Sequence, residues 1–276
     1  MAVALPRLAA VGDNCIDRYV RSTRPATVGG NALNVAVGLA GAGYPTAYLG
    51  AVGDDSDGRL IVETVRAAGV DVSHVRVLAA PTGVTTVELR PGGERVFVEE
   101  AYGASALFRI DERALEVLSA RAWVHAANLT DAAAAVRELA ARGQPISYDF
   151  SDRVDLQLRA ALCPQLEVAV FSSPSDNEAE AASIARAAVA EGANVAVVTR
   201  GAHGSLAATA DDCFAQPTLS GEPIDTLGAG DAFVAAFIVA LLEGAAIPAA
   251  LRRGAASAAE TCEMIGPWPI AKEVRA

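Results

Sequence analysis

The sequence has few of the features that mark metal-binding, secreted or nucleic-acid-binding proteins. Its four cysteines are scattered, with no Cys-x-x-Cys spacing and no neighbouring histidines, which argues against a zinc site or a disulfide framework. The net charge of −11 leaves no basic surplus to neutralise nucleic-acid phosphates or an anionic membrane. A single nucleotide is still an acceptable ligand, because a helix N-terminus can hold a polyphosphate without a basic surface.

Long hydrophobic runs are also missing. The most apolar stretch, residues 229–242, is too short for a membrane span and contains Asp231. Near the N-terminus no basic segment precedes an apolar one, and the polar Gly12-Asp13-Asn14 follows early. We therefore expect a cytoplasmic protein whose partners are small molecules, with neither nucleic acid nor membrane among them.

Hydrophobic periodicity alternates between strands and helices along the chain, which predicts an α/β fold with a mostly parallel central sheet and helices on both faces. The length of 276 residues fits one domain, 1–276. The expected strands are residues 8–11, 47–52, 122–125, 146–150, 168–171 and 195–199. The expected helices are residues 31–42, 57–68, 131–142, 177–191, 229–243 and 248–264.

Three β-rich pieces break this alternation. Residues 84–90 and 95–99 flank Pro91-Gly92-Gly93-Glu94, which is a hairpin signal, and residues 15–20 form a third strand-like piece. We predict that they build a small β lid, formed mainly by about 15–22 and 83–102, that stands off the main sheet. Such a lid covers a site, contacts a second subunit, or does both.

The strongest chemical signal is a glycine-rich turn that leads into an apolar helix. In Gly228-Ala229-Gly230-Asp231, glycine lets the backbone aim several N–H groups at one point, and the helix dipole adds partial positive charge there. Asp231, beside this anion hole, is a candidate general base for an attacking hydroxyl. The alternative is that Asp231 only caps the helix. No GxxxxGK[ST] motif is present, so this is not a P-loop protein.

A second signal lies at the start of the helix expected at 31–42. Gly29 and Gly30 allow the chain to approach a ligand, and Asn31 and Asn34 share one face of the helix. Their amides both donate to and accept from sugar hydroxyls, although Asn31 is also a plausible N-cap. Asp13 follows the first strand, where ligands of open parallel sheets bind, although Gly-Asp pairs also make turns.

Taken together, these motifs resemble those of the ribokinase or PfkB-type carbohydrate kinases over almost the whole chain. The similar segments are GGNALNVAVGLAGAG, YLGAVGDDSDGRLI, VVTRGAHGSL and DTLGAGDAF, the last of which is highly specific. The resemblance implies a ribokinase-like three-layer sandwich with a small β lid. It also implies an ATP-dependent kinase that uses Mg²⁺ and transfers the γ-phosphate to an alcohol.

The resemblance also implies roles for individual residues. Asp231 would be the general base, and Gly228, Ala229 and Gly230 would hold the phosphate. The candidate sugar contacts are Asp13, Gly29, Gly30, Asn31 and Asn34, together with Arg90 in the lid and His125 at a strand end, although a lone histidine is also often structural. The candidate nucleotide contacts are Ser172, Thr199, Gly201, Gly204, Gly228 and Gly230.

The metal positions follow from the same resemblance. The family's Asn-x-x-Glu segment, which positions hydrated Mg²⁺, is altered here: counting from Pro174 selects Glu178, and matching letters selects Glu180. We prefer Glu178; solvated charges that open a helix remain the alternative. Asp225 and Thr226 match positions where some relatives hold a monovalent cation such as K⁺, which not every relative uses.

Three segments of the sequence narrow the choice of sugar substrate. GDNCIDRYV, Val124-His125-Ala126-Ala127 and the segment 147–152 resemble fructoselysine 6-kinases within the family. The expected reaction is phosphorylation of the 6-hydroxyl of fructoselysine or a related fructosamine, with the lid glutamates near the substrate amine. The alternatives are a kinase for fructose, ribose, 2-keto-3-deoxygluconate or a nucleoside, and a non-catalytic sugar sensor. A homodimer through the lid is also expected.

Overall fold

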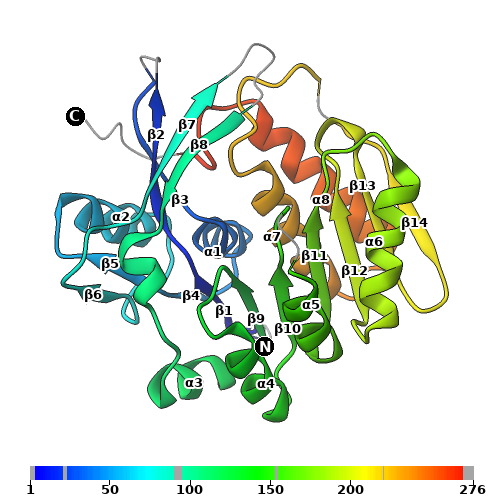
Figure 1. Cartoon of the computed structure of the whole chain (residues 1–276), viewed down its shortest axis with the longest axis horizontal. Helices are drawn as coiled ribbons and strands as arrows, with labels where there is room; N and C mark the ends of the chain where they lie inside the picture. The colour runs from blue at the N-terminus through cyan, green and yellow to red at the C-terminus, as the bar shows by residue number, and fades with distance from the viewer. Residues whose placement is uncertain (1–3, 21–23, 90–94, 153–154, 220, 270–276) are drawn as a thin grey trace.

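A central sheet of eight strands organises the molecule (Figure 1). The computed structural model describes residues 4–20, 24–89, 95–152, 155–219 and 221–269. The sheet comprises β1 (Leu8–Gly12), β4 (Thr46–Leu49), β9 (Trp123–Ala127), β10 (Ile146–Asp149), β11 (Val168–Ser172), β12 (Val195–Thr199), β13 (Ser205–Ala208) and β14 (Cys213–Gln216). Their order is β14-β13-β12-β11-β10-β9-β1-β4, parallel from β12 to β4, with β13 and β14 added antiparallel at one edge.

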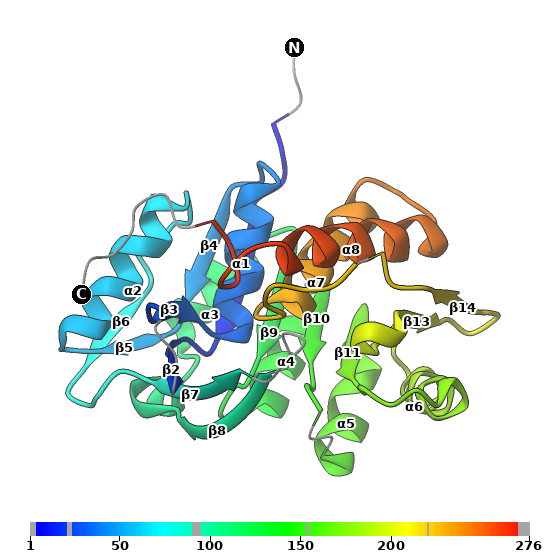
Figure 2. The same ribbon diagram turned by 90° about the horizontal axis from the view of Figure 1, so that it is seen from above.

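Helices cover both faces of this sheet, as seen from above in Figure 2. One face carries α3 (Glu112–Ser119), α4 (Ala132–Ala141), α5 (Leu156–Leu162) and α6 (Glu178–Ala190). The other carries α1 (Asn31–Gly41), α7 (Ala229–Leu242) and α8 (Ile247–Cys262), with α2 (Ser56–Ala67) packed beside α1. The three-layer α/β arrangement expected from the sequence is confirmed.

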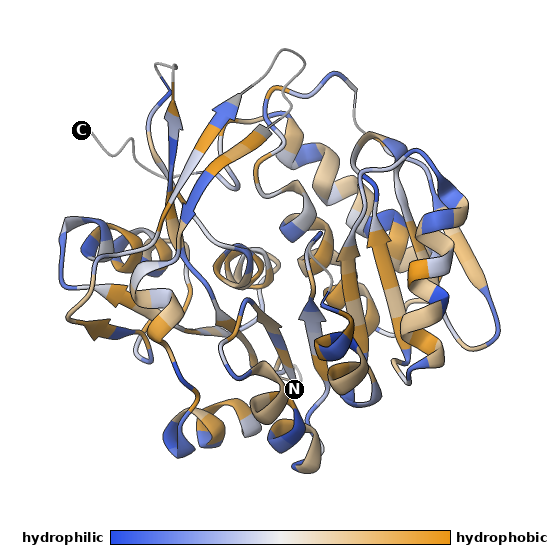
Figure 3. Cartoon of the chain, viewed as in Figure 1, coloured by the Kyte–Doolittle hydropathy of each residue, from blue (hydrophilic) through white to orange (hydrophobic). Residues whose placement is uncertain are grey.

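The buried strands are apolar on both sides because both of their faces meet helices. In β11, Val168 and Val170 pack on the side of α7, whereas Ala169 and Phe171 pack on the side of α6. Figure 3 accordingly shows strands of the sheet coloured as hydrophobic and the outer surface of α6 as partly hydrophilic. The continuous apolar runs of the sequence are therefore the core strands.

The predicted small sheet stands off the main one (Figure 1). Four strands form it in the order β3-β2-β7-β8, comprising β3 (Thr27–Gly29), β2 (Cys15–Val20), β7 (Val84–Leu89) and β8 (Arg95–Ala101). The pairing of β7 with β8 is the hairpin predicted from the sequence, and β2 joins it in parallel. We refer to this four-stranded sheet as the lid.

One expected strand, residues 47–52, is divided in the structure. It forms β4 and then β5 (Ala51–Gly53), which leaves the main sheet and pairs with β6 (Arg76–Leu78). Gly50 lies at the division, where an added Cβ would collide with the Tyr48 hydroxyl and the Gly12 carbonyl. The division between the two strands therefore falls at a position where only glycine fits. Within the described residues, no helix is long and apolar enough to cross a membrane.

Candidate active site

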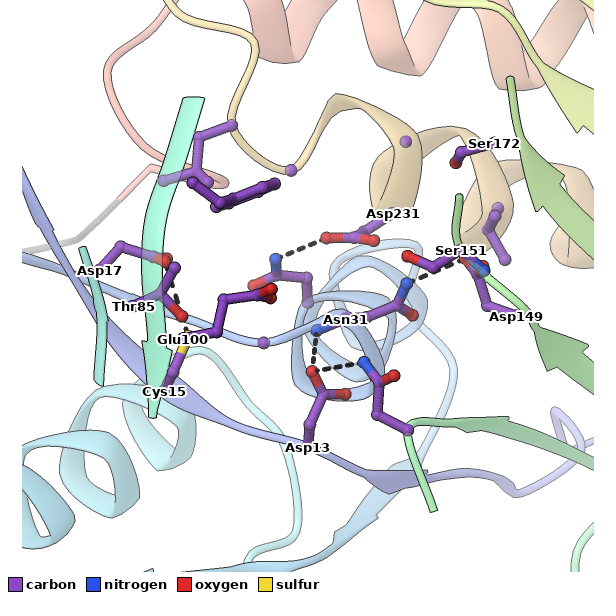
Figure 4. A pocket seen from close by; sticks show the side chains of 18 of the residues that line it. Asp13, Cys15, Asp17, Asn31, Thr85, Glu100, Asp149, Ser151, Ser172 and Asp231 are labelled. Carbon is purple, nitrogen blue, oxygen red and sulfur yellow. Dashed lines mark hydrogen bonds between the residues drawn. The ribbon is translucent and has the colours of Figure 1, made fainter. Parts of the chain in front are cut away.

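A polar pocket lies between the lid and the carboxyl ends of the central strands (Figure 4). The lid contributes Cys15, Asp17, Thr85, Phe97 and Glu100 to its lining. The strand ends contribute Asp13, Asn128, Asp149, Ser151, Ser172 and Thr199, and the two helix starts contribute Gly30, Asn31, Asn34, Gly228, Gly230 and Asp231. Nine of the nineteen residues selected from the sequence therefore line one pocket.

The N-terminus of α7 forms one wall of the pocket. Gly228 has φ of 75°, and a Cβ at this position would collide with Pro267, so glycine is required for the turn. The N–H of Ala229 donates to the backbone carbonyl of Thr226 over 3.3 Å, and no side chain within the described part of the chain caps this helix start. Asp231 follows in the first helical turn, and its Oδ2 accepts a hydrogen bond of 2.6 Å from Asn34 Nδ2. An acceptor carboxylate thus lies beside a helix start that no described side chain caps.

The N-terminus of α1 forms a second wall of the pocket, which contacts the first through Asn34 and Asp231. Asp13 accepts hydrogen bonds of 3.1 Å from the backbone N–H groups of Asn31 and Ala32, and a third from Asn128 Nδ2. Asp13 therefore caps α1 from a distant strand end while lining the pocket. Burial raises the pKa of its carboxyl, and these hydrogen bonds partly oppose that shift. Gly30, with φ of 115°, brings the chain against Asn14, where a side chain would clash.

Asn31 connects this wall to a second buried carboxyl. Its Nδ2 donates to Asp149 Oδ2 over 2.9 Å, and the backbone N–H of Ser151 donates to Asp149 Oδ1 over 2.6 Å. Burial raises the pKa of Asp149 to about 6 in spite of these donors. Ser151 and Asn128 have positive φ values of 58° and 47°, so strained backbone concentrates at the strand ends that line the pocket.

His125 does not line the pocket, contrary to its expected place there. It is fully buried beneath Asn31, with Nδ1 3.0 Å from Ser147 Oγ and Nε2 3.5 Å from Asn31 Oδ1. Burial lowers its pKa to about 3, so the imidazole is neutral at physiological pH. The structural alternative considered for a lone histidine is therefore the better description: His125 supports Asn31 from below.

The expected nucleotide contacts divide into two groups. Ser172 and Thr199 line the pocket at the ends of β11 and β12, with their Oγ atoms 3.2 Å apart. Gly201 and Gly204 lie instead in the tight turn between β12 and β13, both with positive φ. They follow Thr199 by two and five residues and are not part of the pocket lining.

The possible Mg²⁺ position lies at the start of α6. Glu178 begins this helix, and its Oε2 accepts a hydrogen bond of 3.3 Å from Arg200, the residue after Thr199. Among the described residues no group of three or more His, Cys, Asp or Glu side chains forms a metal cage. Mg²⁺ usually keeps several water ligands and binds through few carboxylates, so a carboxylate that acts through water fits this surrounding. Glu180, the alternative, is exposed in the same helical turn.

Asp225 and Thr226 precede the α7 turn and do not line the pocket. Asp225 is fully buried, and its carboxylate is paired with the guanidinium of Arg24 at 3.2 Å. This partner does not fit an exchangeable monovalent cation at the same oxygen. Gly29 lies beside the pocket at the end of β3, where a Cβ would collide with the Asp17 carboxylate. Arg90 lies outside the described residues.

Several residues that line the pocket were not predicted from the sequence. Asp17 belongs to the GDNCID segment and Asp149 to the segment 147–152, and both segments were used for the resemblance, so that resemblance was a usable signal for both residues. Glu100 and Phe97 lie on β8, and only the fold of the lid brings them to the pocket. No local sequence pattern separates Glu100, which lines the pocket, from its neighbour Glu99, which does not.

Comparison with known proteins identifies the family. The model of the pfkB family of carbohydrate kinases matches residues 21–269. The chain belongs to this family. Its members use ATP, and the resemblance on which the sequence analysis relied is confirmed.

Curated relatives and solved structures agree with this assignment. The chain is 37% identical to fructoselysine 6-kinase of Shigella flexneri, over 95% of this chain and 99% of that one. It is 33% identical to fructosamine kinase FrlD of Bacillus subtilis, with 95% and 93% covered. The ribokinase of Arabidopsis thaliana complexed with ribose and ATP superposes with a TM-score of 0.79 at 25% identity, covering 96% of this chain and 94% of that one.

Proposed function

We propose that this carbohydrate kinase transfers the γ-phosphate of ATP to the 6-hydroxyl of a fructosamine, with fructoselysine as the leading substrate. The observation that carries the proposal is that Asp231, Asn34 and the uncapped start of α7 meet in one pocket. The similarity to a fructoselysine 6-kinase and a fructosamine kinase at 37% and 33% identity supports the choice of acceptor.

In the proposed reaction Asp231 takes the proton of the sugar hydroxyl. The hydroxyl oxygen then attacks the γ-phosphorus, and the bond from that phosphorus to the bridging oxygen breaks as ADP leaves. The N–H groups of Gly228, Ala229 and Gly230 would stabilise the charge on the transferred phosphoryl group. Asn34 holds the Asp231 carboxylate at 2.6 Å, which orients the base without removing its acceptor capacity.

The start of α1 would hold the sugar, and the ends of β11 and β12 would hold the nucleotide. Asn31, Gly30 and Asp13 are proposed to contact the sugar, with Gly29 allowing Asp17 to lie close by. The nucleotide would extend past Ser172 and Thr199 towards the turn that holds Gly201 and Gly204. His125 and Arg90 are not used in this proposal.

Mg²⁺ would accompany ATP and neutralise charge on its phosphates. Of the two candidate glutamates, Glu178 is favoured because its carboxylate contacts Arg200, next to Thr199 on the nucleotide side. Arg200 is held in turn by the backbone carbonyl of Asp176 at 2.8 Å. This arrangement supports the register counted from Pro174 over the one obtained by matching letters.

An acidic part of the lid supports an amine-bearing acceptor. Asp17 on β2 and Glu100 on β8 line the pocket from the lid side. A fructosamine carries a protonated amine at C1, at the opposite end of the sugar from the 6-hydroxyl that would reach Asp231. Carboxylates at the lid therefore complement such an acceptor better than a neutral sugar.

A panel of acceptors tests the proposal. Release of ADP would be followed with fructoselysine, other fructosamines, fructose, ribose, 2-keto-3-deoxygluconate and adenosine. We expect the highest kcat/KM on an amine-linked fructose. A higher kcat/KM on a plain sugar or a nucleoside would reject the fructosamine assignment while leaving the kinase assignment in place.

A pair of neighbouring lid variants sharpens the acceptor test. Glu100→Gln should raise KM for fructoselysine by about tenfold, because a charge-assisted contact to the ammonium is worth roughly 1–2 kcal/mol, and should leave KM for fructose unchanged. Glu99→Gln is the matched control, since Glu99 is exposed on the same strand and does not line the pocket. Equal effects on both acceptors would remove Glu100 from amine recognition.

The remaining expectations concern assembly and location. We propose that residues 1–276 act as one domain and that the lid contacts the lid of a second copy, which the exposed apolar Val98, at 57% exposure, supports. Light scattering coupled to size exclusion would measure this dimer. The ATP requirement supports a cytoplasmic location, since ATP is abundant there.

A further inference from the structure

The carboxylate of Asp225 is paired with the guanidinium of Arg24, at a position where the family resemblance allows a monovalent cation. Arg24 Nη1 lies 3.2 Å from Asp225 Oδ2, and Arg24 Nη2 donates to the backbone carbonyl of Ile224 over 3.3 Å. A carboxylate beside a backbone carbonyl is the kind of oxygen pair that replaces the hydration shell of K⁺. In this chain both oxygens face the planar fork of a guanidinium, which is permanently charged.

The other contacts of Asp225 leave little room for an ion. Its Oδ2 also accepts from the Tyr19 hydroxyl at 2.7 Å and from the backbone N–H of Gly266 at 3.2 Å. Oδ1 accepts from the backbone N–H of Leu227 at 3.0 Å. A cation at Oδ2 would have to displace these donors and lie beside a like charge, which is costly at a side chain with no solvent exposure.

This cluster joins the lid to the turn that begins α7. Leu227, held by Asp225, is the residue before Gly228, and its side chain is buried with Tyr19 and Val87 of the lid. The guanidinium of Arg24 also lies over the ring of Tyr19, 5.9 Å from its centroid. The position of the turn therefore depends on a carboxylate whose charge is balanced by Arg24.

We propose that Arg24 is a built-in counter-ion that replaces the monovalent cation and holds the Gly228–Gly230 turn in its phosphate-binding geometry. The inference rests on the proposed role of this turn as the anion hole. Arg24 is a positioning residue, because it acts through Asp225 and Leu227 and not on a substrate. The kinase consequently needs no K⁺, and removal of the Arg24 side chain creates a requirement for an added cation.

Arg24→Ala tests this replacement directly. ADP release would be measured in K⁺, Na⁺ or tetramethylammonium chloride at one ionic strength. Wild-type kcat should stay within about twofold across the salts, whereas kcat of Arg24→Ala should fall by about tenfold or more, as for a displaced anion-hole donor. Millimolar guanidinium or K⁺ should restore part of that loss. Arg18→Ala is the matched control, because Arg18 is an exposed arginine of the lid strand β2 that pairs with Asp57 and not with Asp225.

Thermal unfolding supplies a readout that needs no sugar. K⁺ or guanidinium that binds the folded Arg24→Ala variant should raise its unfolding midpoint with concentration, and should not do so for wild type or Arg18→Ala at matched ionic strength. Because no sugar is present, this measurement tests the role of Arg24 even when the acceptor has been misassigned. Activation of wild type several-fold by K⁺ would overturn the proposal, and so would an Arg24→Ala variant that responds to no cation in either assay.

A conservative variant covers the case in which Arg24→Ala does not fold. Arg24→Lys keeps the positive charge and should retain kcat within about fivefold with no response to K⁺, although it loses the second hydrogen bond of the guanidinium. A folded Arg24→Lys that has lost activity beyond this range and regains it with K⁺ would contradict the counter-ion role, since the ammonium would then have failed to replace the ion.

Discussion

The two helix N-termini that face the pocket are built alike and used differently. Both α1 and α7 begin after a glycine with positive φ, Gly30 at 115° and Gly228 at 75°, and neither glycine has a side chain to cap its helix. At α1 the protein supplies its own anion, because Asp13 accepts from the first two helical N–H groups. At α7, within the described residues, no side chain does the same for Ala229 and Gly230.

The difference separates a structural helix start from one available to a ligand. A helix N-terminus attracts negative charge through its dipole and its unpaired N–H groups. When a buried carboxylate already satisfies them, as at α1, the helix start is fixed and its side chains, Asn31 and Asn34, face the pocket. At α7 no described side chain caps the helix start beside Asp231, which supports the proposal that this end binds a phosphate.

The largest expected effect is at the α7 end. Asp231→Asn should lower kcat by about 10²- to 10⁴-fold, because the amide cannot take the proton of the attacking hydroxyl. Asn34 can still donate to the new side-chain oxygen, so sugar binding should persist. ADP release measures kcat, and calorimetric titration with the sugar is the control. Retained activity would mean that Asp231 is only part of the helix start and not the general base.

The next effect concerns the geometry of the same turn. Gly228→Ala should lower kcat by about 10²-fold, because a Cβ would meet Pro267 and displace the aligned N–H groups. Gly244→Ala is the matched control: Gly244 follows the other end of α7 with φ of 80° and open space around it. It should cost about 1–2 kcal/mol of unfolding free energy with kcat unchanged. Equal kcat values in the two variants would contradict an anion hole at Gly228.

The smallest effect tests the carboxyl-rich α1 end through pH. The pKa of Asp149, raised to about 6 by burial, lies above its unfolded value of about 3.9. The folded state therefore binds the proton more tightly, so this group contributes stability that is fully present below about pH 4 and is lost as the pH rises through about 6. Relative to Asp149→Asn, the wild-type unfolding free energy should fall by up to about 3 kcal/mol between pH 4 and 7.

Urea denaturation at a series of pH values would measure this difference. Glu116→Gln, which neutralises an exposed carboxyl on α3, is the control. A difference between wild type and Asp149→Asn that does not change with pH would show that the buried carboxyl keeps an ordinary pKa. Burial of the ionised Asp149 carboxylate near the α1 end would then not lower the unfolding free energy.

Local patterns predicted the elements that carry the site, with some misses. Strict apolar runs and helical periodicity identified β11, β12, α1 and α7 to within a residue or two. The short helices α3 and α5 and the edge hairpin of β13 and β14 were not predicted, because brief elements owe their stability mainly to packing. The division at Gly50 was likewise not predicted, because it depends on the pairing of β5 with β6, which lies more than 20 residues further along the chain.

The sequence by itself determined the α/β class, the lid hairpin and the glycine turn before Asp231, because these depend on residues close together in the chain. Tertiary structure alone decided how the polar groups are paired. Asn34 meets Asp231 across 197 positions, and Arg24 meets Asp225 across 201. Contacts between distant segments therefore decide which helix start is capped by a carboxylate and which has no side-chain cap, because a buried charge is stable only beside the partners that the fold brings to it.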